Sequence, residues 1–170
     1  MGTPEAGKLF LERLTSLSDS PIDLTTPRNF DTTALSGIRD VTTSPGRLQC
    51  VMKVTPRVAN RYGTLHGGCI ATLVDTVGSA ALVTQSTRSG VSLNISVDYL
   101  SPMPSGEDCE IDARVVKVGK NIATINVELR RKQTKQLVAQ GTHVKFMAAS
   151  EVEIKGLHEF KDLPIARSKL

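Results

Sequence analysis

The spacing of hydrophobic residues changes along this 170-residue chain and separates one helical segment from several extended ones. Between His66 and Arg88, twenty-one residues carry Asp75 as their single charge. Apolar residues recur there at helical spacing, namely Ile70, Leu73, Val74, Val77 and Ala81. Steps of three and four residues place them on one side of a helix. The pattern predicts one long helix over residues 67–87, with this apolar stripe lying on a sheet.

Period-two alternation, which is typical of strands, occurs on both sides of this helix. Before it, Leu48, Cys50, Met52 and Val54 alternate with other residues and predict a strand over 47–58. After it, further strands are expected over 91–100, 108–118, 122–131 and 136–147. Their short connections contain proline, glycine and asparagine, which favour turns. Connections of hairpin length imply an antiparallel sheet, and one helix covers one face of it, so the predicted fold class is α+β.

The remaining segments are shorter or less regular. Residues 4–17 have apolar positions at helical spacing and predict a short amphipathic helix. Residues 18–45 are rich in serine, threonine, proline and aspartate, so an irregular lead-in is expected there. The chain length fits one compact domain. We therefore divide the chain into an N-terminal helix with its lead-in (1–44), a main domain (45–148) and a C-terminal tail (149–170).

Composition argues against several classes of function. The net charge is +4, aromatic residues make up 4% and tryptophan is absent, whereas nucleic-acid binding needs a denser basic stripe and stacking aromatics. The mild positive charge suits small anions, including phosphorylated ligands. The cysteines form no CxxC pair and are odd in number, and the histidines do not fall at metal-ligand spacing, so we expect no disulfide framework and no metal site. No apolar segment is long enough to span a bilayer, and no secretory signal pattern precedes the domain.

The last three residues form a short targeting motif. They are Ser168-Lys169-Leu170, the tripeptide address that the peroxisomal import receptor reads. Arg167 adds a basic flank, and Pro164 lies in a polar stretch that favours an exposed end. An ordinary polar tail is the alternative. The sequence predicts a peroxisomal protein that is imported through this tripeptide.

Asp75 draws attention because the side of the helix around it is built from small residues. At about 100° per residue, Asp75 lies about 150° from the apolar stripe. Its neighbours there are Gly68, Ala71, Thr72, Gly78, Ser79 and Leu82. We expect a second helix or a sheet edge to pack on this side and to hold the carboxylate away from bulk water. Such a group serves chemistry or a specific polar contact, with a turn cap or an ion pair as an equal alternative.

The start of the helix offers a second chemical feature. Gly67 and Gly68 leave backbone N–H groups accessible there, with the helix dipole behind them, and this arrangement stabilises an oxyanion. A tight entry turn is the simpler alternative. Gly67 and Asp75 are eight residues apart, about 12 Å along a helix, so they cannot both touch one carbonyl group. If they cooperate, Gly67 of one subunit must meet Asp75 of another across a twofold axis.

A longer motif surrounds these residues. It consists of Asn60, Gly63-Thr64-Leu65-His66-Gly67-Gly68, Ala71-Thr72-Leu73-Val74-Asp75, Ser92 and Tyr99-Leu100-Ser101-Pro102. With this motif, the chain resembles the hotdog-fold acyl-CoA thioesterases of the thioesterase superfamily member 2 type, which are relatives of the phenylacetyl-CoA thioesterases. The resemblance covers residues 45–147. It implies a hotdog fold, in which an antiparallel sheet wraps around one long central helix, and a homodimer that pairs further into a dimer-of-dimers tetramer.

The resemblance also implies a role for each catalytic candidate. The N–H group of Gly67 would polarise the thioester carbonyl, and Asn60 and His66 would help to fix the substrate and the loop. Asp75 of the neighbouring subunit would act as a general base on water, or as a nucleophile. Ser92 would hold that water or the acid. A thiolate is a good leaving group, so little acid assistance is needed.

Other residues have weaker signals. The resemblance implies that Gly68 and Lys120 bind substrate, Lys120 near the coenzyme A phosphates, although a solvated turn lysine fits equally well. For His66 we favour a structural role over acid–base work. Cys69 is interpreted as a small buried packing residue rather than as a nucleophile. His143 is interpreted as a packed strand residue, and Ser92 as a simple strand hydroxyl remains an alternative.

The resemblance predicts an enzyme that hydrolyses acyl-CoA thioesters to the free acid and coenzyme A without a metal or cofactor. One alternative is a non-catalytic acyl-CoA-binding protein on the same fold, and another is a thioesterase for aromatic, naphthoyl-type CoA esters. A third alternative, a hotdog hydratase, would use an aspartate and a histidine paired on the helix region, and this pairing is not found. The sequence does not determine the acyl chain.

Overall fold

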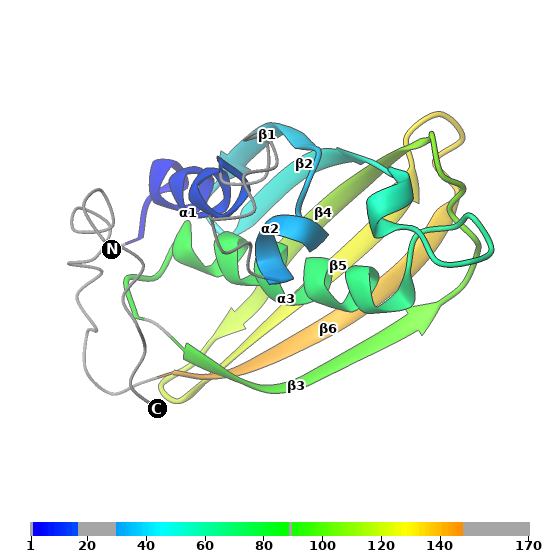
Figure 1. Ribbon diagram of the computed structural model, residues 1–170. Coiled ribbons are helices and arrows are strands. Elements are labelled where there is room, and N and C mark those ends of the chain that lie inside the picture. Colours follow the sequence, from blue (N-terminus) through cyan, green and yellow to red (C-terminus); the bar gives the residue numbers. More distant parts are fainter. Residues whose placement is uncertain (1, 17–29, 89, 148–170) are drawn as a thin grey trace, which may run out of the picture.

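The computed structural model describes residues 2–16, 30–88 and 90–147 (Figure 1). The described helices are α1 (Pro4–Ser16), α2 (Phe30–Ala34) and α3 (Gly67–Val83), with a 3-10 turn at Pro56–Val58. The described strands are β1 (Ile38–Ser44), β2 (Arg47–Lys53), β3 (Gly90–Tyr99), β4 (Asp108–Val118), β5 (Ile122–Arg131) and β6 (Leu137–Met147).

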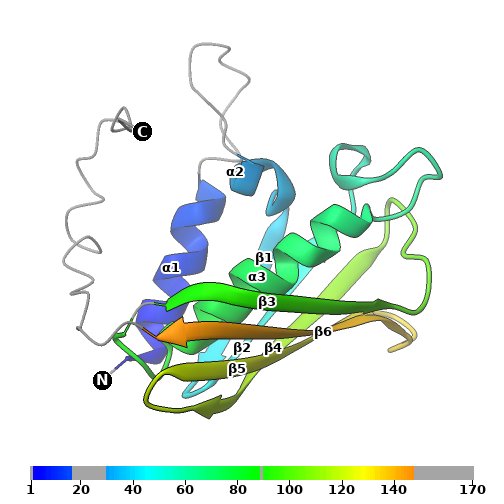
Figure 2. The same ribbon diagram turned by 90° about the horizontal axis from the view of Figure 1, so that it is seen from below.

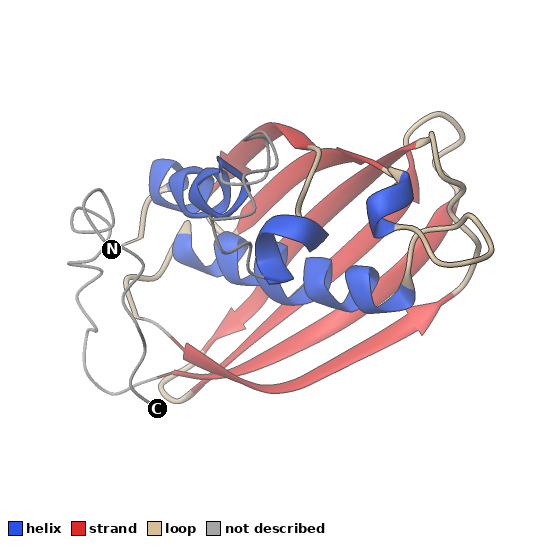
Figure 3. Ribbon diagram, viewed as in Figure 1, coloured by secondary structure: helices blue, strands red, loops and turns tan. Residues whose placement is uncertain are grey.

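These strands form one six-stranded antiparallel sheet in the order β1-β2-β4-β5-β6-β3. The described helices lie on one side of this sheet (Figure 3). The sheet curves around α3, which runs along its concave side (Figure 2). Strands β1 and β3 are its two edges. The predicted α+β class, with one long helix against an antiparallel sheet, is confirmed.

Helix α3 packs on the sheet through the apolar stripe that the sequence predicts. All five residues of the stripe are buried, from Leu73 at 0% exposure to Ile70 at 5%. Burying one such side chain stabilises the fold by about 1.5–3 kcal/mol. The helix ends at Val83 and not at residue 87, because the N–H groups of Thr84 and Gln85 bond to carbonyl oxygens three residues back and tighten the last turn.

The N-terminal region is more regular than the sequence indicates. The predicted helix near the N-terminus is α1, but the irregular lead-in is wrong for residues 30–44, where α2 and β1 form. Strand β1 passes through a Pro45-Gly46 turn into β2, with Ser44 opposite Arg47. Gly46 has φ +74°, a conformation that glycine adopts without strain. The sheet therefore begins before residue 45.

The other predicted strands agree more closely with the structure. The strand expected over 47–58 ends at Lys53, because Pro56 has no N–H group to donate and begins the 3-10 turn. The four later strands match their predicted ranges to within one residue at each end. The hairpin connections therefore occur where the turn residues indicate.

Some predictions fall on residues that the structure does not describe. The tail over 149–170, with its terminal Ser168-Lys169-Leu170, lies outside the described residues, so peroxisomal import stays a prediction. None of the described helices is long and apolar enough to cross a membrane. The described residues also contain no group of three or more histidine, cysteine or acidic side chains placed to hold a metal ion.

Candidate active site

The loop that leads into α3 is held together by one side chain, Asn60. Its Oδ1 atom accepts hydrogen bonds from the backbone N–H groups of Tyr62 (2.9 Å) and Thr64 (3.2 Å), and its Nδ2 donates to Oγ1 of Thr64 (2.9 Å). Gly63, with φ +75°, makes the tight turn inside this loop. The Asn60 amide is thus occupied in fixing the loop, which is part of its predicted role.

His66 caps the N-terminus of α3. Its backbone is extended, and its Nδ1 accepts a hydrogen bond of 2.9 Å from the N–H group of Gly68. A Cβ atom at position 68 would lie 3.1 Å from that Nδ1, so glycine leaves room for the cap. The structural role favoured for His66 agrees with this geometry. The N–H group of Gly68, which was expected to contact substrate, is already occupied.

Gly67 carries the open N–H group at the start of α3. No acceptor for this N–H occurs among the described residues. The carbonyl oxygen of Gly67 accepts a hydrogen bond of 3.2 Å from the hydroxyl of Tyr99, at the end of β3, and the Tyr99 ring lies beside the glycine. The free N–H lies at the positive end of the helix dipole, where it can stabilise an oxyanion.

Asp75 meets two side chains from the neighbouring strands β3 and β6. Its Oδ1 lies 3.4 Å from Oγ of Ser92 and 3.5 Å from Nε2 of His143. Oγ of Ser92 is 2.9 Å from the same Nε2. His143 is fully buried, whereas the Asp75 side chain is 42% exposed. In the single chain the carboxylate is partly open to water, because β3 is the last strand on that side, and its shielding by a second chain stays a prediction.

The protonation of His143 follows from its surroundings. Burial, and then the charge of Lys145, lower the pKa of His143 to about 4, while the charge of Asp75 acts in the opposite direction. The imidazole is therefore neutral at pH 7. Its Nδ1 is buried and has no hydrogen-bond partner among the described residues. A buried Nδ1 without a partner is less unfavourable as a bare lone pair than as an N–H group. We therefore assign the proton to Nε2, which donates a hydrogen bond to Oγ of Ser92.

This cluster is not a serine nucleophile system. In a Ser-His-Asp triad, the carboxylate binds one ring nitrogen of the histidine and the serine binds the other. Here both Asp75 and Ser92 face Nε2 of His143. Ser92 accepts a hydrogen bond from Nε2–H of His143 and can turn its own hydroxyl hydrogen to Asp75. The chain of hydrogen bonds ends on the carboxylate, which is the group that can accept a proton from water.

The site residues that the sequence predicts lie in three separate places in one chain. Gly67 and Asp75 are about 12 Å apart along α3. The turn between β4 and β5, which contains Lys120, lies near the C-terminal end of the helix (Figure 1). The first group contains Asn60, His66 and Gly67, the second contains Asp75 and Ser92, and the third is Lys120. One chain therefore does not bring these predicted residues together.

Part of the small-residue side of α3 is filled by the same chain and not, as expected, by a second subunit. Gly78 lies against β5 and β6, where an added Cβ would meet Nδ1 of His143 at 3.5 Å. Ser79 accepts a hydrogen bond of 2.9 Å from Nζ of Lys145. On this side of α3, the helical turn that carries Asp75 remains partly exposed to solvent.

The sequence analysis missed the partners that β6 supplies. The packed position predicted for His143 agrees with its burial, but neither its contact with Ser92 nor the neighbouring Lys145 is among the predictions. His143 and Lys145 occupy buried positions of a strand whose pattern alternates between buried and more exposed residues. Ionisable side chains at successive inward positions of a strand interior are rare unless they are paired. That pattern is the signal that could have identified them.

Cys69 agrees with its interpretation as a packing residue. Its thiol is buried and donates to the carbonyl oxygen of Ala34, with Sγ 3.2 Å from the oxygen. Burial raises the pKa of Cys69 to about 12. The thiolate, which is the nucleophilic form, is therefore absent at neutral pH.

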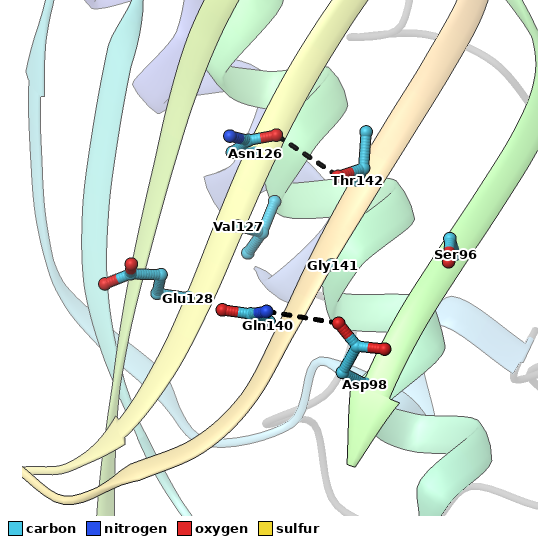
Figure 4. A pocket seen from close by; sticks show the side chains of 8 residues that line it. All are labelled: Ser96, Asp98, Asn126, Val127, Glu128, Gln140, Gly141 and Thr142. Carbon is cyan, nitrogen blue, oxygen red and sulfur yellow. Dashed lines mark hydrogen bonds between the residues drawn. The ribbon is translucent and has the colours of Figure 1, made fainter. Parts of the chain in front are cut away.

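A hollow on the surface of the single chain lies away from the candidate site. Strands β3, β5 and β6 line it on the face of the sheet opposite the helices, which lie behind the strands in Figure 4. Gln140 donates to Asp98 (3.1 Å) and Thr142 donates to Asn126 (3.3 Å) across it. Its lining includes none of the predicted site residues.

Comparisons with known proteins agree with this geometry. The family model of the thioesterase superfamily matches residues 62–138. Acyl-coenzyme A thioesterase 13 of Homo sapiens is 43% identical over 125 residues, which cover 73% of this chain and 89% of that protein. The crystal structure of zebrafish thioesterase superfamily member 2 has a TM-score of 0.73 and 35% identity, and the match covers 86% of this chain and 99% of that one.

A bacterial structure is also similar. The Streptococcus mutans protein smu.793, solved bound to acetyl-CoA, has a TM-score of 0.63 and 27% identity over 73% of this chain and 94% of its own. Fold and sequence therefore agree on one assignment. The chain belongs to the thioesterase superfamily, has the hotdog fold and is a thioester hydrolase.

Proposed function

We propose that this protein hydrolyses acyl-CoA thioesters to the free acid and coenzyme A. The observation that carries the proposal is the Asp75 cluster, in which Ser92 and His143 orient a carboxylate that is still partly open to water. The relatives support the substrate class, since one is named an acyl-coenzyme A thioesterase and another was solved with acetyl-CoA.

Each active site would be shared between two chains. Gly67 and Asp75 are too far apart on one helix to act on the same carbonyl group. Strand β3 is a sheet edge and carries exposed apolar residues, with Val91 66% and Leu93 56% exposed. An exposed apolar edge strand favours pairing with another strand. Pairing of two β3 edges across a twofold axis would extend the sheet into a homodimer, and two such dimers would form the tetramer.

The chemical steps follow from these groups. Asp75 of one chain takes a proton from water as the oxygen of that water bonds to the thioester carbon. The N–H group of Gly67 of the other chain stabilises the charge that develops on the carbonyl oxygen. The tetrahedral intermediate then expels the coenzyme A thiolate and leaves the free acid, and the proton on Asp75 passes to the thiolate or to solvent. In the second route the carboxylate of Asp75 attacks the carbon itself, the coenzyme A thiolate leaves, and water hydrolyses the resulting mixed anhydride to the free acid and Asp75.

Lys120 would bind the phosphates of coenzyme A. It is exposed in the turn between β4 and β5, where it can provide a point charge for a phosphate. We expect Lys120→Ala to raise KM with little change in kcat, because the phosphates lie far from the reacting carbon. The same variant should lose less with a dephospho-CoA thioester. An equal rise in KM with both thioesters would contradict the assignment of Lys120 to the phosphate site.

Turnover of a panel of acyl-CoAs by the purified full-length protein tests the proposal. The panel should contain short, medium, long, branched and aromatic acyl groups, including a naphthoyl-type ester. We expect hydrolysis of at least one class, with a fall in kcat of about 10²–10⁴-fold in Asp75→Asn. Full activity in a folded Asp75→Asn protein contradicts the mechanism. Tight binding of acyl-CoA without any turnover would instead identify a non-catalytic binding protein.

A further inference from the structure

Lys145 is a buried lysine on β6, beside the Asp75 cluster. The residue is 8% exposed, and its Nζ donates a hydrogen bond of 2.9 Å to Oγ of Ser79 on α3. Lysine is almost never buried unless it is paired. Burial of an ammonium group is unfavourable unless hydrogen bonds and an opposite charge compensate it. Ser79 supplies the hydrogen bond, so the opposite charge must come from another residue.

Asp75 is placed to supply that charge. Ser79 follows Asp75 by four residues, which is about one helical turn, so the two side chains lie on the same side of α3. On β6, Lys145 follows His143 by two residues, and both side chains point to the helix side of the sheet. The carboxylate, the imidazole and the ammonium therefore form one cluster between α3 and β6.

The three groups act on one another electrostatically. Burial lowers the pKa of Lys145, and the charge of Asp75 opposes this effect. Burial also lowers the pKa of His143, the charge of Lys145 lowers it further, and Asp75 opposes both. Lys145 therefore attracts the carboxylate and disfavours a second positive charge on the imidazole.

The flanking strands add no competing charge to this cluster. The residues opposite His143 and Lys145 are Ile125 and Ala123 on β5, and Ile95 and Ser92 on β3. All four are uncharged, and α3 contributes a single charge, Asp75. Among the described residues, the charges that act on His143, besides its burial, are therefore those of Lys145 and Asp75.

We propose that Lys145 is a positioning residue of the thioesterase site, whose ammonium group, anchored on Ser79, acts together with burial to keep His143 uncharged beside Asp75. This inference rests on the proposed function. An uncharged His143 directs its Nε2–H to Ser92 and leaves the hydroxyl hydrogen of Ser92 for Asp75. A charged His143 would pair directly with the carboxylate and weaken it as a base.

The test compares the wild type with Lys145→Met, which removes the charge and keeps much of the side-chain length. Two quantities are measured against pH in the full-length protein: kcat/KM for an acyl-CoA, and the NMR signals of the His143 imidazole. In Lys145→Met we expect the titration midpoint of His143 to rise by on the order of one pH unit. The acid limb of the kcat/KM profile should move to higher pH with it. Lys145→Arg, which keeps the charge, should restore the wild-type profile.

Two further variants separate this role from simple packing. Ser79→Ala removes the anchor and should shift the His143 midpoint in the same direction by a smaller amount. Lys117→Met, at an exposed position of β4, removes a charge elsewhere and should change neither quantity. A Lys145→Met protein that loses activity equally at every pH, with an unchanged His143 midpoint, overturns the inference. The NMR titration does not depend on turnover. An inactive wild-type protein would therefore contradict the proposed function, while the His143 midpoint would still test the role of Lys145.

Discussion

Oγ of Ser92 lies 2.9 Å from Nε2 of His143, so a buried imidazole on β6 holds a hydroxyl of the edge strand β3. Because His143 is neutral and donates this hydrogen bond, the hydroxyl hydrogen of Ser92 can point to Asp75, 3.4 Å away. The carboxylate is thus oriented by a neutral donor, and no lysine or arginine of the described residues donates a hydrogen bond to it directly. A carboxylate held in this way remains available to accept a proton from water.

Removal of the Ser92 hydroxyl should therefore impair catalysis. We expect Ser92→Ala to lower kcat by about 10-fold to 100-fold, because the loss of one hydrogen bond to a charged group is worth about 1.5–3 kcal/mol. KM should change little. Steady-state kinetics with the best acyl-CoA measures both values. Ser96→Ala is the matched control, since Ser96 lies on the same strand and lines the hollow on the opposite face. Equal effects of the two substitutions would show a general weakening of β3.

The oxyanion role of Gly67 can be tested with proline. Pro is tolerated at the first position of a helix, and His66 already has the extended conformation that precedes proline, with φ −65° and ψ 134°. Gly67→Pro removes the N–H group, and we expect kcat to fall by about 10²–10³-fold. Gly67→Ala keeps the N–H and should retain most of the activity. Circular dichroism checks that both variants fold. Comparable activity of the two variants would exclude this donor.

A mixture of two inactive variants tests whether the site is shared. Equimolar Gly67→Pro and Asp75→Asn chains, dissociated and reassociated, should form heterodimers in which one of the two sites has both groups intact. Random pairing makes half of the dimers heterodimers, so the mixture should recover about one quarter of the wild-type activity. Each variant reassociated alone is the control. No recovery in a mixture shown to contain heterodimers would place Gly67 and Asp75 in separate sites.

The sequence predicts the scaffold better than the contacts of the site. Local signals place α3 and the strands from β3 to β6, because periodicity and turn residues act over short distances. Strand β1 is missed because its serine and threonine residues resemble a loop, although the Pro45-Gly46 turn indicates a hairpin. The contact between Ser92 and His143 depends on the pairing of β3 with β6, which lie far apart in the sequence. Only the register of the sheet brings them together.

Cys69 should prove dispensable for catalysis. It lies at the start of α3, beside the open N–H of Gly67, but its thiol is buried and its pKa is raised to about 12 by that burial. We expect Cys69→Ala to keep kcat within about 2-fold of the wild type, with some loss of stability from the lost side-chain contacts. Iodoacetamide at pH 7.5 should leave Cys69 unmodified in the native protein, as mass spectrometry of peptides can show. Rapid alkylation with parallel loss of activity would contradict the packing role.

His143 should make the stability of the fold depend on pH. Its pKa in the folded chain is about 4, below the ordinary value of 6.5, because burial and Lys145 disfavour the charged form. Between these two values, the unfolded chain binds a proton that the folded chain does not. Stability from this residue is therefore fully present above about pH 6.5 and is lost as the pH falls towards 4. We expect a loss of about 2 kcal/mol in the free energy of unfolding between pH 7 and pH 5.

His143→Gln isolates that contribution, since glutamine does not titrate. Urea unfolding at pH 7 and pH 5, at one protein concentration, gives the change in stability for each protein. We expect His143→Gln to be less stable than the wild type at pH 7 but to lose less on acidification. If the wild type and His143→Gln lose the same stability between the two pH values, His143 is not held neutral in the folded protein.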